Sequence, residues 1–131
     1  MTTSTKESDM NNFYHGCNNP AEILKAVAAA KQGQAAIKGD FHVAPKEMVA
    51  RNYGKYLVAF VLAADVIGAH VGMINKNGNM NAAVGNEVEV VMNNEAAKFD
   101  FAKKVIAAKV HCPDGRVAEI NVENGEIVNV A

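Results

Sequence analysis

The sequence predicts an α+β fold, in which an N-terminal arm and helix precede a mostly antiparallel small β-barrel or β-sandwich. One helical pattern opens at Asn19-Pro20, and several short strand patterns follow between Gly, Asn and Pro turns. At 131 residues, the chain has the size of one domain with one core. We therefore expect an arm over residues 1–18 and a single domain over residues 19–131, with a β-rich C-terminal half.

The first twelve residues consist mainly of Thr, Ser, Lys, Glu, Asp and Asn. They contain too little apolar surface to offset the entropy lost on ordering, so we expect an arm that is mobile or held by a partner. They also lack the apolar core of a secretion signal. We expect a cytoplasmic or virion location.

The helical pattern runs from Pro20 to Gly33. Asn19 suits an N-cap, Pro20 suits the first helical position, and Gly33 is a typical residue after a helix end. The apolar stripe is narrow. We expect this stripe to pack on the protein's own sheet. As an alternative, it docks on another chain through Ile23 and Val27.

The middle of the chain alternates strand and helix signals. Short strands are predicted around residues 35–37 and 41–43, and a two-turn helix over residues 45–53, begun by Pro45. The run Tyr56–Leu62 is rich in strand-forming residues and lies between Gly54 and Gly68, so we predict a buried strand there, with a helix as the alternative.

The apolar run continues to Ile74 and approaches the length of a membrane span. Asp65 and His70 lie inside it, and ionisable residues near the centre of a bilayer are costly. We therefore expect no membrane partner. A buried Asp beside a His can orient a general base, although an Asp that caps a turn explains the same pattern.

The second half reads as strands at 87–92, 98–102 and 105–110, followed by a hairpin. We predict a three-residue hairpin loop, Glu123–Gly125, with Gly125 in the left-handed region. This register pairs Ile120 with Val128 and leaves Ile127 on the polar face, where we expect a subunit contact. The predicted buried face consists of Ala118, Ile120, Val122, Val128 and Val130.

Composition argues against several classes of function. The net charge is -1 and the only two arginines are Arg51 and Arg116, which does not favour nucleic-acid binding. The only serines, Ser4 and Ser8, lie in the polar arm, so a serine-based triad is not expected. We expect no cofactor.

Two His/Cys pairs are the best candidates for metal chemistry. His15 and Cys17 lie near the start, and His111 and Cys112 follow a predicted strand. Four such side chains match the ligands of a zinc site, but their spacing matches no zinc motif, so we predict no bound zinc. The two cysteines are expected to be free thiols, with one disulfide as the alternative.

These observations favour a non-catalytic structural or assembly protein that self-associates or decorates a larger assembly, such as a small virion or shell component. The alternative is a small enzyme or ligand-binding barrel with a pocket around Asp65, His70 and Tyr56. We expect the partners to be other protein subunits, in a homo-oligomer.

Overall fold

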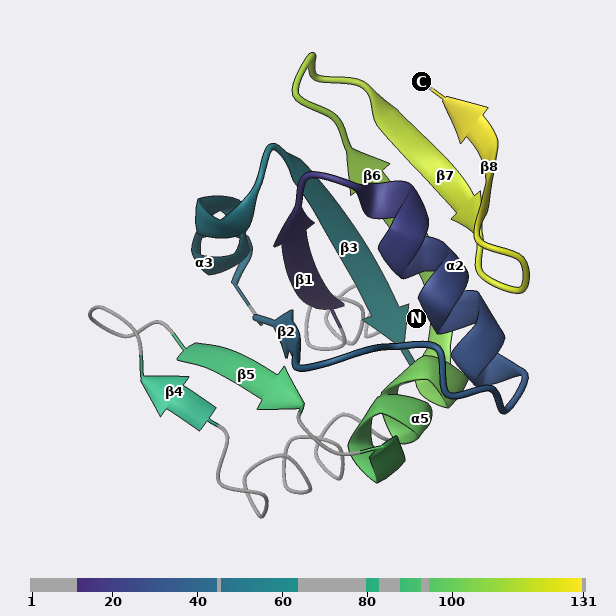
Figure 1. The fold of residues 1–131 in the computed structure, drawn as a ribbon. Helices are drawn as coiled ribbons and strands as arrows, with labels where there is room; N and C mark the ends of the chain where they lie inside the picture. The colour runs from purple at the N-terminus through teal and green to yellow at the C-terminus, as the bar shows by residue number, and fades with distance from the viewer. Residues whose placement is uncertain (1–11, 45, 64–79, 83–87, 93–94, 131) are drawn as a thin grey trace, which may run out of the picture.

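The main sheet has five strands in the order β1-β3-β6-β7-β8, and all neighbouring strands are antiparallel. The computed structural model describes residues 12–44, 46–63, 80–82, 88–92 and 95–130. Among these, the sheet is open, with β1 and β8 at its edges (Figure 1). The α+β class is therefore confirmed, whereas the sheet is not closed into a barrel. The strands are β1 (Asn12–Cys17), β3 (Tyr56–Leu62), β6 (Val105–His111), β7 (Val117–Asn121) and β8 (Glu126–Val130).

Strand β1 corrects the predicted boundary of the arm. Residues 12–17, which we expected to belong to the arm, pair with β3 from Asn12 opposite Val61 to Cys17 opposite Tyr56. Phe13 is only 2% exposed, and its burial helps to offset the cost of ordering this segment. Residues 1–11 of the predicted arm lie outside the described residues.

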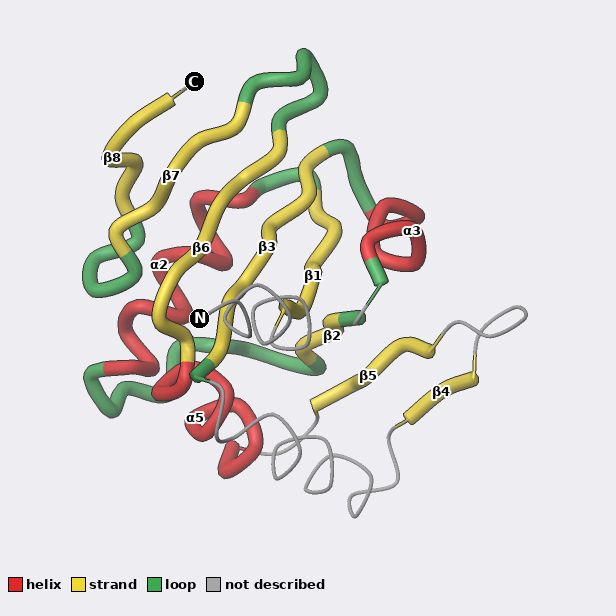
Figure 2. The backbone as a smooth tube through the Cα atoms, turned by 180° about the vertical axis from the view of Figure 1, so that it is seen from behind, coloured by secondary structure: helices red, strands yellow, loops and turns green. Residues whose placement is uncertain are grey.

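Helix α2 (Pro20–Lys31) confirms the first helical prediction. Pro20 occupies the first turn as expected, although the Asn19 side chain makes no capping hydrogen bond. Helices α2 and α5 pack against each other on the same face of the main sheet, and Figure 2 shows α2 behind the strands and α5 at their lower end. At its C-terminal end, the Lys31 ammonium donates a hydrogen bond of 2.7 Å to the Val105 carbonyl, which joins α2 to the start of β6.

Helix α5 (Glu95–Lys104) overturns the strand predicted over residues 98–102. The prediction relied on the alternation of Phe99 and Phe101, but the buried positions follow a helical period. They are Ala97, Lys98, Phe101 and Ala102. Glu95 in the first turn and two lysines in the last turn also favour the helix, because they oppose the helix dipole.

The second sheet contains three antiparallel strands, β2 (Phe41–Val43), β5 (Val88–Met92) and β4 (Met80–Ala82), in that order. Strands β2 and β5 match predicted segments, whereas residues 35–37 form no strand. The helix predicted over residues 45–53 is a short α3 (Glu47–Ala50) followed by a turn of 3₁₀ helix, η1 (Arg51–Tyr53).

Four phenylalanines hold α5 and both sheets together. The Phe41 and Phe60 rings each meet Phe101 edge to face, with centroids 5.3 and 5.4 Å apart. Phe13 packs on Phe101 in the same way at 6.2 Å. Such contacts add to the stabilisation from area burial alone. The core therefore lies between the main sheet, α2, α5 and β2.

The C-terminal hairpin differs from the predicted register. Gly125 has a φ of 77°, as predicted, but Ile120 pairs with Ile127 rather than with Val128. The pairing skips Val128, which makes it the extra residue of a β-bulge. Since residues opposite each other share a face, Ile127 lies on the same face as Ile120 and not on the predicted polar face.

Burial of the hairpin also differs from the prediction. Ala118 and Ile120 are buried as expected, whereas Val128 and Val130 are exposed. Five strands at about 4.8 Å spacing make a sheet wider than one helix of about 10–12 Å diameter. Helix α2 meets the hairpin at Gly125, beside Leu24, and leaves the side chains of Val128 and Val130 exposed.

Candidate functional site

Strand β8 is an edge strand whose residues are all exposed. Its apolar side chains, Ile127, Val128 and Val130, are 63%, 66% and 44% exposed. Glu126 is its one charged residue, and it contains neither lysine nor proline. Natural edge strands usually carry lysine or proline, which prevents pairing with other chains. Apart from its bulge, β8 lacks these protections.

Strand β1, at the other edge, is paired by the chain itself. The Tyr14 N–H donates to the Ala44 carbonyl, and the Ala44 N–H donates to the Tyr14 carbonyl, each over 2.8 Å. Helix α3 also packs closely here, because a Cβ atom at Gly16 would collide with the Ala50 carbonyl. This edge is therefore closed to a second chain at Tyr14.

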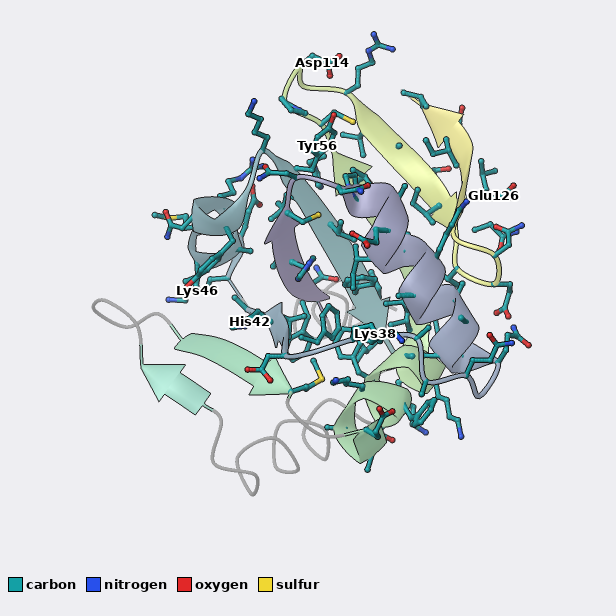
Figure 3. The ribbon with its side chains drawn as sticks, in the orientation of Figure 1. Lys38, His42, Lys46, Tyr56, Asp114 and Glu126 are labelled. Carbon is teal, nitrogen blue, oxygen red and sulfur yellow. The ribbon has the colours of Figure 1, made fainter. Side chains whose placement is uncertain are left out.

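A groove of about 450 Å³ adjoins β8 on the α2 face of the sheet. Figure 3 shows two of its lining residues, Tyr56 and Asp114, at the same end of the sheet. At its rim, Arg116 Nε lies 3.1 Å from Asp114 Oδ2, in an exposed ion pair. The apolar lining consists of Tyr56, Cys112, Pro113, Ala118, Ile127 and Val130. The groove and the exposed face of β8 thus share two side chains.

A second hollow, which we call the His15 cavity, has a volume of about 460 Å³. It lies between α2, the end of β1 and the segment that leads from α2 into β2. Its lining combines apolar walls with polar side chains, which is typical of small-molecule sites. The lining residues are His15, Cys17, Asn18, Asn19, Glu22, Ile23, Ala26, Ala36, Ile37, Lys38, Asp40 and Phe41.

The His15 ring is held in one orientation. Its Nδ1 lies 2.6 Å from the His42 carbonyl oxygen, and the ring packs on Phe41 with centroids 5.1 Å apart. A carbonyl only accepts, so Nδ1 carries the proton and donates it. Desolvation by burial lowers the pKa of His15, with a smaller opposing effect of the hydrogen bond to His42. At neutral pH the ring is therefore uncharged, with a lone pair on Nε2.

Cys17 lies on the same face of β1 as His15, but it does not form a reactive pair with it. Desolvation by burial raises the pKa of the Cys17 thiol, and a backbone hydrogen bond with Asn19 opposes this only partly. The thiol is therefore protonated at neutral pH, whereas a cysteine nucleophile needs a thiolate. This arrangement can bind a ligand, but it does not favour nucleophilic catalysis.

The two His/Cys pairs do not converge. His15 and Cys17 line the His15 cavity, Cys112 lines the groove beside β8, and His111 lines a third hollow on the opposite face of the sheet. Both cysteines are free thiols. No three His, Cys, Asp or Glu side chains of the described residues are placed to hold a metal ion.

Of the remaining predicted site residues, the structure describes Tyr56, Ile23 and Val27, which lie at three different places in the fold. Tyr56 lines the groove beside β8, while Asp65 and His70, its proposed neighbours in a pocket, lie outside the described residues. Ile23 lines the His15 cavity. Val27, a predicted interface residue, is 2% exposed in the core and has no free surface to offer a partner.

Sequence reasoning missed two features of these sites. The exposure of Val128 and Val130 depends on how far α2 reaches across the sheet, which no local pattern records. Lys38 and Asp40 come to the His15 cavity on a segment without regular structure. The spacing of His15 and Cys17 could have indicated that both side chains line one cavity, because alternate residues of a strand share a face.

Comparison of the chain with protein-family models, with curated proteins and with solved structures found no match. Within the described part of the chain, none of the helices has the length and apolar character needed to cross a bilayer.

Proposed function

We propose that this protein is a non-catalytic assembly protein that self-associates through β8, as a virion or shell component would. The observation that carries the proposal is the exposure of three apolar side chains along an edge strand. An exposed strand edge presents backbone N–H and C=O groups that another strand can pair with, and apolar side chains gain from burial in the same contact.

The charge pattern of β8 favours a second copy in antiparallel orientation. Glu126 stands at one end of the strand, and Val130 stands at the other. Antiparallel pairing of two copies centred on Val128 places each Glu126 opposite the partner's Val130. Parallel pairing in register would place the two carboxylates side by side, which is unfavourable. A two-fold axis between the copies then closes the contact in a dimer.

The groove beside β8 supports the same surface. Ile127 and Val130 belong both to the groove lining and to the edge strand. A second chain that pairs with β8 would therefore also cover the mouth of the groove. The added apolar burial makes the contact more favourable than backbone hydrogen bonds alone, whose net contribution is about 1 kcal/mol each.

The mass in solution, measured by light scattering over a range of concentrations, tests this proposal. We expect the wild-type protein to self-associate and Ile127→Lys to remain monomeric with an unchanged circular dichroism spectrum. Ile106→Lys is the matched control, because Ile106 is 61% exposed, Ile127 is 63% exposed, and Ile106 lies on β6, which is paired on both sides.

Two results would contradict the proposal. One is a wild-type protein that stays monomeric at every concentration. The other is an Ile127→Lys variant that keeps the oligomeric mass while Ile106→Lys loses it, which would place the contact on the open face of the sheet.

A further inference from the structure

The His15 cavity is separate from the β8 edge and shares no lining residue with the groove beside it. Its volume of about 460 Å³ falls within the usual range for sites that bind small molecules. One wall is apolar, formed by Ile23 and Ala26 of α2 together with Ile37 and Phe41.

The inner part of the cavity offers a hydrogen-bond acceptor. Nδ1 of His15 is already bonded to the His42 carbonyl, so Nε2 is the ring nitrogen left for a ligand. No described residue donates a hydrogen bond to Nε2. A half-buried acceptor without a donor is costly unless water or a ligand supplies one. A ligand group that carries an O–H or N–H would do so.

The rim of the cavity has the opposite character. Glu22 and Asp40 are exposed there, with Lys38 as the single cation (Figure 3 shows Lys38 on the segment after α2). Two carboxylates against one ammonium give the rim a net negative charge of one. A cationic group on the outer end of a ligand would interact favourably with this rim, although solvent weakens the attraction.

We propose that the His15 cavity binds a small hydroxylated amine, with its hydroxyl group donating to His15 Nε2, an apolar body between Phe41 and Ile23, and its ammonium group at the Glu22 and Asp40 rim. The neutral state of His15 supports this assignment, because an imidazolium would have no lone pair for the hydroxyl. The protonated Cys17 thiol beside it adds no charge to the inner part of the site.

Tyramine is the probe, because it carries a phenol, an apolar ring and an ammonium in a line. Phenethylamine lacks the hydroxyl, and 4-ethylphenol lacks the ammonium. We expect saturable shifts of backbone amide resonances at His15, Ile23 and Phe41 when tyramine is titrated into the full chain. Phenethylamine should bind up to about tenfold more weakly, which corresponds to one lost hydrogen bond.

Variants of the rim distinguish binding at this site from nonspecific binding of the probe. Glu22→Gln combined with Asp40→Asn should remove the preference for tyramine over 4-ethylphenol, because both side chains are exposed and the rim would no longer carry their negative charges. Asp114→Asn, which lies in the groove beside β8, is the control and should leave the preference unchanged.

The proposal is overturned if neither phenol gives saturable shifts up to its solubility limit, or if phenethylamine binds as tightly as tyramine. It is also overturned if 3-(4-hydroxyphenyl)propionate binds more tightly than tyramine, because Lys38 would then determine the charge of the ligand. His15→Phe should abolish the difference between tyramine and phenethylamine, and a folded variant that keeps this difference would exclude His15 as the acceptor.

Discussion

The two edges of the main sheet differ in whether other parts of the chain cover them. At β1, the Tyr14 backbone exchanges two hydrogen bonds with Ala44, and α3 packs against Gly16. At β8, all residues are exposed and the apolar side chains face solvent. A sheet that simply avoided aggregation would protect both edges. The proposal that β8 pairs with another chain rests on this difference.

The two edge strands also differ in the contacts that fix them. Strand β1 is fixed by contacts from three directions, namely β3, α3 and Ala44. Strand β8 is fixed by β7 and by the hairpin loop that touches α2. We expect substitutions on the β1 side to cost most in stability, and substitutions on β8 to act mainly on association.

Gly16→Ala should have the largest effect on stability. A Cβ atom at this position would collide with the Ala50 carbonyl, and the backbone on neither side can yield without disturbing the closed edge. We expect a loss of about 3 kcal/mol in the free energy of unfolding, measured by urea denaturation.

Gly39→Ala is the control for Gly16→Ala. Gly39 has a φ of 63°, and a Cβ atom there would meet no other atom within 4 Å. It should lose about 1 kcal/mol through backbone strain alone. Equal losses in the two variants would mean that α3 does not hold the β1 edge.

Gly125→Val tests how the hairpin is attached to the body. Gly125 has a φ of 77°, and its Cβ would lie 2.8 Å from the Leu24 carbonyl oxygen of α2. Backbone strain and this contact together should cost about 2 kcal/mol, again by urea denaturation. Gly115→Val should cost less, since Gly115 also has a positive φ but has open space around it. A larger loss at Gly115 would show that α2 does not constrain the hairpin.

Local turn chemistry explains how much of this fold could be predicted. Asn19-Pro20 marked the start of α2, Tyr56–Leu62 was predicted as a strand with the correct bounds, and Gly125 was predicted to have a positive φ. Each of these depends on a few adjacent residues. The error at α5 arose because Phe99 and Phe101 alternate like a strand, whereas the burial of Ala97 and Phe101 is set by tertiary packing.

The candidate sites were harder to predict than the elements. The His15 cavity requires the carbonyl of His42 and the side chains of Lys38 and Asp40, which chain folding brings to β1. The bulge at Val128 likewise changes the face of Ile127, and one skipped residue is enough to reverse it. Ile127 is exposed, but it was singled out from a register that the hairpin does not adopt, and its subunit contact stays a prediction.

The β1 edge also carries the half-buried His15, whose protonation should make the stability of the fold depend on pH. Burial places the pKa of His15 below 6.5 in the folded protein. Between that lowered pKa and about 6.5, the unfolded chain binds more protons, so the free energy of unfolding should fall as pH falls through this window and then level off. Urea denaturation from about pH 7.5 to about pH 5 measures the slope, and His15→Gln should flatten it. An identical slope in this variant would assign the effect to other groups.

Val128→Lys should have the smallest effect on stability. Val128 is 66% exposed and is skipped by the pairing with β7, so a lysine there displaces no packed neighbour. In dilute protein, where association is negligible, the free energy of unfolding should change by no more than about 0.5 kcal/mol. At higher concentration the same variant should lose self-association, since an antiparallel contact centred on Val128 would bring two lysines together. Val128→Thr, which keeps the branched shape without a charge, should retain part of the association. A loss of roughly 2 kcal/mol in dilute Val128→Lys would mean that this side chain is covered within its own chain, and the contrast between the two edges would then fail.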